Sequence, residues 1–294
     1  MSNRSSLVGI GISTRDRWRD LELTLQRLQE KGLHHCETIV IDDFSQQSIP
    51  VHLSAEYPWV RFIRSERQMG YIAQRNRLAK LLTADTYLSL DDDSYIEAGD
   101  VFESANWLFT HPKIIALGFP IVLGDNPLKT EVGNEYHSIR FFIGCAHLLN
   151  RRHFLELGGY REELETHCEE TEFTLRACGQ GFGVLSYPAV TVRHLVSKEG
   201  RNNARINRFL TRNDLWIAAW HYPFIFMVMS FLNCLPRQFK YAAHRQHWRS
   251  VLQGFCLAMI SLPRIWKLRS PLSYNQYWEW RRRSYPISGR SAKS

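Results

Sequence analysis

Three short apolar segments near the start of the chain each run directly into polar side chains. Residues 7–12 (LVGIGI), ETIVI and TYLSL have the apolar character of strands, and helix patterns over about residues 20–31 and 71–82 lie between them. The polar clusters are Ser13-Thr14-Arg15, Asp42-Asp43 and Asp91-Asp92-Asp93. This alternation predicts an α/β fold with a Rossmann-like, mostly parallel central sheet flanked by helices. Because ligands of such sheets bind beyond the carboxyl ends of the strands, the clusters predict one shared crevice.

The triplet Asp91-Asp92-Asp93 carries the clearest chemical signal of the three clusters. Adjacent carboxylates repel one another unless a cation neutralises them, and Mg²⁺ or Mn²⁺ takes such oxygen ligands together with phosphate oxygens. On an extended segment Asp91 and Asp93 share one face, which suits a metal bridge to a diphosphate. The alternative is a solvated turn that caps the next helix, and the strand TYLSL before the triplet favours the metal.

Two further acidic groups admit both a chemical and a structural role. Asp42 and Asp43 would accept hydrogen bonds from a nucleobase or ribose, or they would form an Asx-turn. Glu169, Glu170 and Glu172 crowd one turn, which raises glutamate pKa values and suits a general base. The same three acids also suit the first turn of an ordinary helix, where the dipole favours negative charge.

The order of the motifs resembles that of family 2 glycosyltransferases of the GT-A fold. The resemblance covers about residues 7–200, and FFIGCAHLL (residues 141–149) within it predicts a further core strand. Each motif is weak alone, and their common order is the strong signal. The motifs are GISTRDRWRDLELTLQRL, IVIDDFS, GYIAQRNRLAK, YLSLDDDS, GGYRE, EETEFTLRACGQGF and VTVRH.

The resemblance implies a donor site for a nucleoside-diphosphate sugar, linked to UDP, dTDP or GDP. Most of its residues come from the three clusters and from the QRN motif. In family terms the nucleotide is contacted by Ser13, Thr14, Arg15, Asp42, Asp43, Arg75, Asp91 and Asp92. Asp91 and Asp93 match the metal-binding D-x-D, and His194 matches a histidine that reaches the metal or diphosphate. Gly144-Cys145-Ala146 resembles the stretch that borders donor and acceptor.

The resemblance also implies the catalytic base. Glu169-Glu170 matches a pair usually written Glu-Asp, whose second member is the base, so Glu170 is expected to act and Glu169 is the alternative. Glu170 would deprotonate an acceptor hydroxyl that attacks the anomeric carbon from the opposite face, which inverts its configuration. Mg²⁺ or Mn²⁺ and basic groups would stabilise the departing nucleoside diphosphate.

The last third of the chain has a different character. From Arg201 onward 16 lysines and arginines accompany two acids, Asp214 and Glu279, and six of the nine tryptophans lie there. We therefore expect a catalytic domain over residues 1–200 and a basic helical extension over residues 201–294. The apolar segments 216–235 and 248–268 predict amphipathic helices on an anionic membrane surface, ahead of packing on the domain or a transmembrane pair.

These features predict an enzyme of cell-surface polysaccharide synthesis with a glycan or lipid-linked acceptor. Arg205 to Trp220 also resembles the Arg-Asn segment that follows the catalytic domain in bacterial members of the family. The polar start and the scattered cysteines, expected free and buried, predict a cytoplasmic protein at the inner face of the cell membrane.

Two alternative functions belong to other classes. A nucleotidyltransferase would also use carboxylates at strand ends, but its Gly-rich basic loop is missing after the first strand. A nucleic-acid-binding module would fit the sequence pI of about 9.3, but the acidic first 200 residues fit it poorly, so no nucleic acid is expected.

Overall fold

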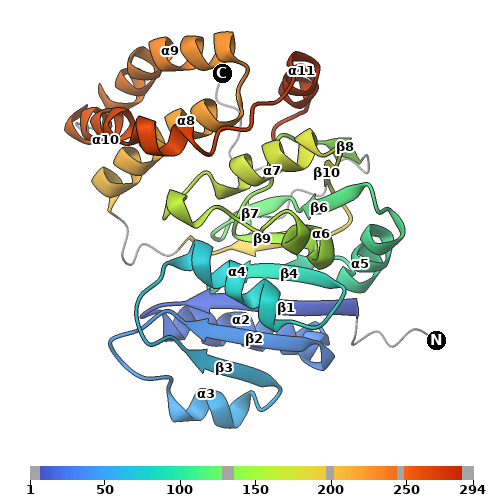
Figure 1. The fold of residues 1–294 in the computed structure, drawn as a ribbon. Helices are drawn as coiled ribbons and strands as arrows, with labels where there is room; N and C mark the ends of the chain where they lie inside the picture. Colours follow the sequence, from blue (N-terminus) through green and yellow to red (C-terminus); the bar gives the residue numbers. More distant parts are fainter. Residues whose placement is uncertain (1–6, 128–135, 197–201, 244–247, 287–294) are drawn as a thin grey trace.

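The computed structural model describes residues 7–127, 136–196, 202–243 and 248–286. A central eight-stranded sheet has the order β3-β2-β1-β4-β9-β6-β10-β8, and a three-stranded sheet has the order β5-β11-β7 (Figure 1). The strands are β1 (Val8–Thr14), β2 (Glu37–Asp42), β3 (Val60–Arg64), β4 (Thr86–Asp91), β5 (Ser94–Ala98), β6 (Ile114–Gly118), β7 (Ile121–Leu123), β8 (His137–Ser138), β9 (Ala146–Asn150), β10 (Gly183–Ser186) and β11 (Thr191–His194).

Helices α2 to α7 alternate with the strands along the chain, and helices α8 to α11 come after the last strand. They are α2 (Trp18–Glu30), α3 (Val51–Glu56), α4 (Tyr71–Leu81), α5 (Val101–Thr110), α6 (Arg151–Glu156), α7 (Glu169–Gly179), α8 (Asn203–His221), α9 (Phe224–Ala243), α10 (Trp248–Trp266) and α11 (Tyr274–Arg282), with single 3₁₀ turns at Leu33–His35 and Glu162–Leu164. The α/β alternation expected from the sequence is confirmed.

The first half of the sheet follows directly from the sequence pattern. Strands β3, β2, β1 and β4 are parallel neighbours, and β1, β2 and β4 form from the three apolar segments identified in the sequence. Helix α2 buries Leu21, Leu25 and Leu28, whose spacing places them on one helix face against the sheet. Helix α4 buries its apolar stripe within a second core cluster, so side chains fill both faces of the sheet.

The second half of the sheet departs from the prediction of a strand over residues 141–149. Only the later part of that segment is a strand, β9, which runs antiparallel between β4 and β6. Residues 141–145 form an irregular connection, in which Gly144 lies against the side chain of Glu170. The apolar character of this segment reflects burial, which periodicity alone cannot distinguish from strand structure.

The small sheet brings the strand β11 back to the triplet. Strand β11 pairs antiparallel with β5, and the register places His194 opposite Ser94. The backbone amide of Leu195 also donates to the carbonyl oxygen of Asp93 at 2.9 Å. His194 is therefore fixed beside the triplet by strand pairing.

The predicted apolar segment 248–268 corresponds to helix α10, whereas the segment 216–235 does not form a single helix. Residues 216–235 are divided between α8 and α9, because Pro223 lacks a backbone N–H and disfavours helical geometry at Tyr222, whose ψ is 142°. Among the described residues, no helix is long and apolar enough to cross a membrane.

Helices α8 and α10 pack closely, and both contribute to a core cluster that they share with the central sheet. A Cβ atom added at Gly254 of α10 would lie 2.3 Å from the carbonyl oxygen of Arg208 in α8, so only glycine permits this approach. Leu215 and Trp220 of α8 belong to the same buried cluster as Phe173 of α7. The expected domain boundary near Arg201 lies outside the described residues and stays a prediction.

No disulfide joins the six cysteines, all of which lie in described parts of the chain. Four are buried as expected, whereas Cys256 is exposed on α10 and Cys168 is partly exposed.

Candidate active site

The three polar clusters meet at one edge of the central sheet, as the sequence predicts. Across the parallel β1–β2 pair Thr14 lies opposite Asp42, and across β1–β4 Ser13 lies opposite Asp91. The carboxyl ends of β1, β2 and β4 therefore form a continuous polar rim.

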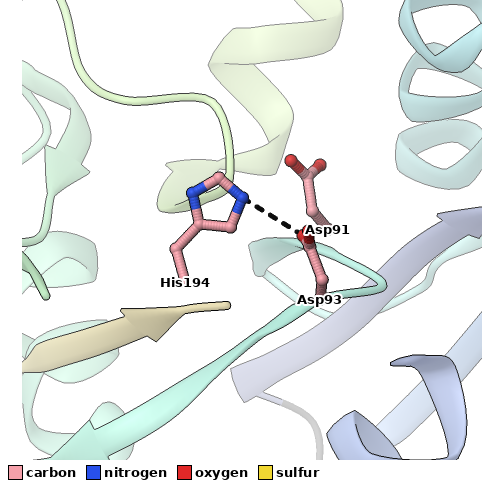
Figure 2. Close-up of side chains that lie close together, drawn as sticks. All are labelled: Asp91, Asp93 and His194. Carbon is pink, nitrogen blue, oxygen red and sulfur yellow. Dashed lines mark ion pairs between the residues drawn. The ribbon is translucent and has the colours of Figure 1, made fainter. Parts of the chain in front are cut away.

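Asp91, Asp93 and His194 converge on a point where a metal ion fits. One ligand atom from each lies within 4.8 Å of the others, and His194 Nε2 is 3.2 Å from Asp93 Oδ1 (Figure 2). Two carboxylates and an imidazole form a donor set that a divalent cation accepts. The chemistry and spacing of these residues thus fit Mg²⁺ or Mn²⁺.

Arg17 is a residue of this rim to which the sequence analysis assigned no role. Arg17 directly precedes α2. Its guanidinium lies 3.0 Å from Asp92 Oδ1 and 2.5 Å from Asp93 Oδ2. Asp92 also accepts a hydrogen bond of 2.8 Å from the hydroxyl of Thr14. Burial raises the pKa of Asp92 to about 8, against the opposing effect of Arg17. The triplet is thus held by cationic and hydroxyl partners from the first strand and its loop.

Arg75 joins the triplet to the glutamate pair. Its guanidinium donates to Asp91 at 2.6 Å, to Glu169 at 2.8 Å and to the carbonyl oxygen of Gly144 at 2.8 Å. The side chain is only 3% exposed, so these bonds operate away from bulk water. Sequence placed Arg75 near the nucleotide, and the structure gives it a bridging position between α4, β4 and α7.

The glutamate pair is divided between a buried and an accessible member. Glu169 is 1% exposed and receives hydrogen bonds from Arg75 and from the hydroxyl of Tyr71 at 3.2 Å, whereas Glu170 is partly exposed. Burial and the neighbouring charge of Glu169 raise the pKa of Glu170 well above its usual value, although Arg75 opposes them. An accessible carboxylate with a raised pKa has the properties of a general base.

Gly144 provides the space that Glu170 occupies. A Cβ atom added at Gly144 would lie 2.0 Å from Glu170 Oε1 and 3.2 Å from the guanidinium of Arg75. The small residue expected here from the sequence is thus required by the position of the glutamate.

The carboxylates of Asp42 and Asp43 accept hydrogen bonds from other residues of the chain. Asp42 is fully buried and accepts hydrogen bonds from the Ser45 amide and from Arg64. Asp43 accepts from the backbone amides of Met69 and Gly70 and from Gln74, at 2.6 to 2.9 Å. Their expected contacts with a nucleotide stay predictions, as do those of the partly exposed Ser13 and the exposed Arg15.

The sequence matches Glycosyl transferase family 2 over residues 10–163, more than half of the chain, and the chain therefore belongs to that family. The protein is a nucleotide-sugar-dependent glycosyltransferase, and this class fits the rim of carboxylates better than the nucleotidyltransferase or nucleic-acid-binding alternatives. No curated protein matches the chain.

Three solved structures have a similar fold at low sequence identity. Mannosyltransferase PcManGT from Pyrobaculum calidifontis, in complex with GDP-Man and Mn²⁺, has 15% identity and a TM-score of 0.58, over 87% of this chain and 75% of that one. TarS 1–349 of S. aureus in complex with UDP-GlcNAc has 14% identity and a TM-score of 0.57, over 89% and 83%. GalNAc-T7 with UDP, GalNAc and Mn²⁺ has 18% identity and a TM-score of 0.57 over 72% of this chain, which spans half of that protein.

Substitution of Gly144 by alanine should remove activity without unfolding the protein. The new methyl group displaces the flexible end of Glu170, so we expect sugar-nucleotide turnover to fall about 10²-fold, a typical result of an ångström-scale misplacement. The midpoint of urea unfolding should change little, because a side-chain end can move at small cost. The control is the same substitution in a Glu170→Gln background, where it should have little further effect. Equal losses in both backgrounds would contradict this account.

Proposed function

We propose that this glycosyltransferase inverts the anomeric configuration of the sugar that it transfers to an acceptor hydroxyl. The observation that carries the proposal is the arrangement of Asp91, Asp93 and His194 on one side of Arg75 and of the glutamate pair on the other. A candidate site for a metal ion and a diphosphate would thus lie next to a candidate base at the same edge of the sheet.

The donor would bind at the rim formed by the ends of β1, β2 and β4. Asp91, Asp93 and His194 would hold Mg²⁺ or Mn²⁺, which when bound neutralises charge on the diphosphate as the leaving group departs. Ser13, Thr14, Arg15, Asp42, Asp43, Arg75 and Asp92 would surround the nucleotide. Similar structures contain UDP with Mn²⁺, GDP-Man with Mn²⁺, or UDP-GlcNAc, and they support a nucleoside-diphosphate sugar as donor.

Glu170 would act as the base in a single displacement. The acceptor hydroxyl gives its proton to the Glu170 carboxylate, its oxygen bonds to the anomeric carbon, and the bond from that carbon to the phosphate oxygen breaks. Attack opposite the leaving group inverts the configuration. Glu169 is instead buried and bonded to Arg75, and burial of Glu170 together with the neighbouring Glu169 raises the pKa of Glu170.

Binding of the nucleotide should depend on the metal and on the triplet. We expect one of UDP, dTDP and GDP to raise the melting temperature in the presence of Mn²⁺ and to do so much less without it. Asp93→Ala should lose the Mn²⁺-dependent part of this rise in melting temperature, because the substitution removes a carboxylate ligand. Asp125→Ala is a control for removal of an acid outside the rim. The metal assignment fails if Asp93→Ala responds to Mn²⁺ and nucleotide as the wild type does.

The acidic limb of the pH–rate profile should report Glu170. Turnover requires the deprotonated carboxylate, so the raised pKa predicts that kcat falls as the pH drops through a value above the usual 4.3 or so of glutamate. Glu170→Gln should reduce kcat by about 10²- to 10⁴-fold and abolish that limb, with nucleotide affinity retained. Near-normal turnover of Glu170→Gln, measured by release of nucleoside diphosphate, would exclude Glu170 as the base.

We further propose that helices α9 and α10 bind an anionic membrane surface, at the cytoplasmic face of the cell membrane. Helix α9 exposes Phe224, Ile225, Met229 and Leu232, which recur on one side of the helix, with Leu232 72% exposed. Helix α10 exposes a second apolar stripe that includes Ile260 at 78%. Exposed apolar surface of this extent marks an interaction site.

Charge on the same helices favours a lipid surface as the partner. The exposed residues Arg249, Arg264 and Lys267 lie in or directly after α10, and Trp248 and Trp266 are half-exposed at its two ends. Basic side chains with boundary tryptophans suit anionic headgroups. A membrane location supports a lipid-linked or polysaccharide acceptor and a role in cell-surface polysaccharide synthesis.

Flotation with vesicles tests the membrane proposal. The wild type should float with phosphatidylglycerol vesicles and much less with phosphatidylcholine vesicles, and Leu232→Glu/Ile260→Glu should stay at the bottom of the gradient because carboxylates enter the apolar stripes. Phe109→Glu, a matched change at a 53% exposed position of α5, should float normally. If the double variant floats like the wild type, α9 and α10 are not the membrane surface.

A further inference from the structure

The segment that leads into α7 has an unusual backbone. Glu165, His167 and Cys168 all have positive φ values, of 60°, 63° and 71°, although none is glycine. Such conformations are sparsely populated by side chains with a Cβ atom and persist only where the surroundings impose them. Because α7 begins at Glu169, this backbone sets the direction in which Glu169 and Glu170 leave the loop.

Helix α8 supplies bonds that impose this conformation. The side-chain amide of Asn213 is fully buried and donates to the carbonyl oxygens of Leu164, Thr166 and His167, at 3.0, 2.7 and 2.9 Å. Its own oxygen accepts from Arg212 Nε at 3.0 Å. One amide therefore fixes three successive parts of the loop and is itself oriented by its neighbour.

Arg212 adds a second set of bonds to the same loop. Its guanidinium donates to the carbonyl oxygen of Leu164 at 2.9 Å and to the Glu165 carboxylate at 2.7 Å. From the opposite side the hydroxyl of Tyr71 accepts from the His167 amide at 2.7 Å and donates to Glu169 at 3.2 Å. The loop before the glutamate pair is thus held between α8 and α4.

A buried ionic group joins the first turn of α7 to the end of α8. Glu172, fully buried, accepts from Arg161, Arg176 and His221, the last residue of α8, at 2.7 to 2.9 Å. Burial alone would raise the pKa of Glu172, but Arg176 and His221 lower it to about 2. Helix α8 therefore contacts the loop before the glutamate pair and the α7 residue Glu172 after it.

We propose that Asn213, oriented by Arg212, is a positioning residue for the candidate base Glu170. The α8 helix, outside the catalytic domain expected from the sequence, would then complete the active site through the loop 163–168. This inference rests on the proposed function in that it takes Glu170 as the base, whereas the positioning itself is measurable without turnover.

The pKa of Glu170 is the readout that separates positioning from general stability. The side chain faces Glu169, Arg75, Tyr71, Tyr160 and Cys145, and burial with the charge of Glu169 raises its pKa. If the loop relaxes, Glu170 gains solvent and loses its place beside Glu169, so its pKa should fall toward the ordinary value near 4.3.

The experiment titrates Glu170 in full-length Asn213→Ala by NMR of carboxyl-labelled glutamate, with the signal assigned by its loss in Glu170→Gln. We expect the pKa to fall and kcat to drop about 10²-fold, with Mn²⁺-dependent UDP or GDP affinity unchanged, since the donor rim is built on other elements. The control is Asn233→Ala, which removes an exposed amide bonded only to Met229 of its own helix among the hydrogen bonds described. An unchanged Glu170 pKa in folded Asn213→Ala would overturn the proposal.

Two further variants keep the outcome decisive. If Asn213→Ala does not fold, Arg212→Gln, which disturbs the orientation of Asn213, should lower the Glu170 pKa in the same direction, and an unchanged value there overturns the proposal. Glu170→Gln separates the two hypotheses. If it turns over normally while Asn213→Ala still lowers the Glu170 pKa, the positioning stands and only the assignment of the base fails.

Discussion

The bonds of Arg75 are the interaction on which the rest of the site depends. A buried guanidinium with few partners is costly, and Arg75 is stable here because Asp91, Glu169 and the Gly144 carbonyl surround it. Its bonds to Asp91 and Glu169 connect the end of β4 to the start of α7. A single side chain of α4 therefore joins Asp91, one of the three candidate metal ligands, to the glutamate pair.

The register of the central sheet positions the polar side chains at its edge, and the smaller sheet and Gly144 position their neighbours. Parallel pairing of β1 with β2 and β4 lines up three polar strand ends, and β11 pairs with β5 so that His194 lies beside Asp93. Glycine at position 144 then admits Glu170 to the same edge. Each step uses backbone pairing or close approach, which leaves little freedom for the side chains that carry the chemistry.

The C-terminal helices contribute to this organisation in two directions. Toward the catalytic region, α8 bonds to the loop before α7 and shares its buried core. Away from it, α9 and α10 expose apolar stripes with basic neighbours. Helix α8 therefore connects the loop before the glutamate pair to the outward helices α9 and α10.

The sequence by itself determined the α/β alternation, the polar strand ends and the family, because strands, helices and their terminal residues are encoded by local periodicity. The partners of those residues were decided only by the tertiary structure. Arg17 at the triplet, Arg64 on Asp42 and Asn213 on the loop before α7 are joined by long-range packing, which leaves no local pattern to read. The irregular path of residues 141–145 was likewise hidden, since a buried connection and a buried strand have the same apolar composition.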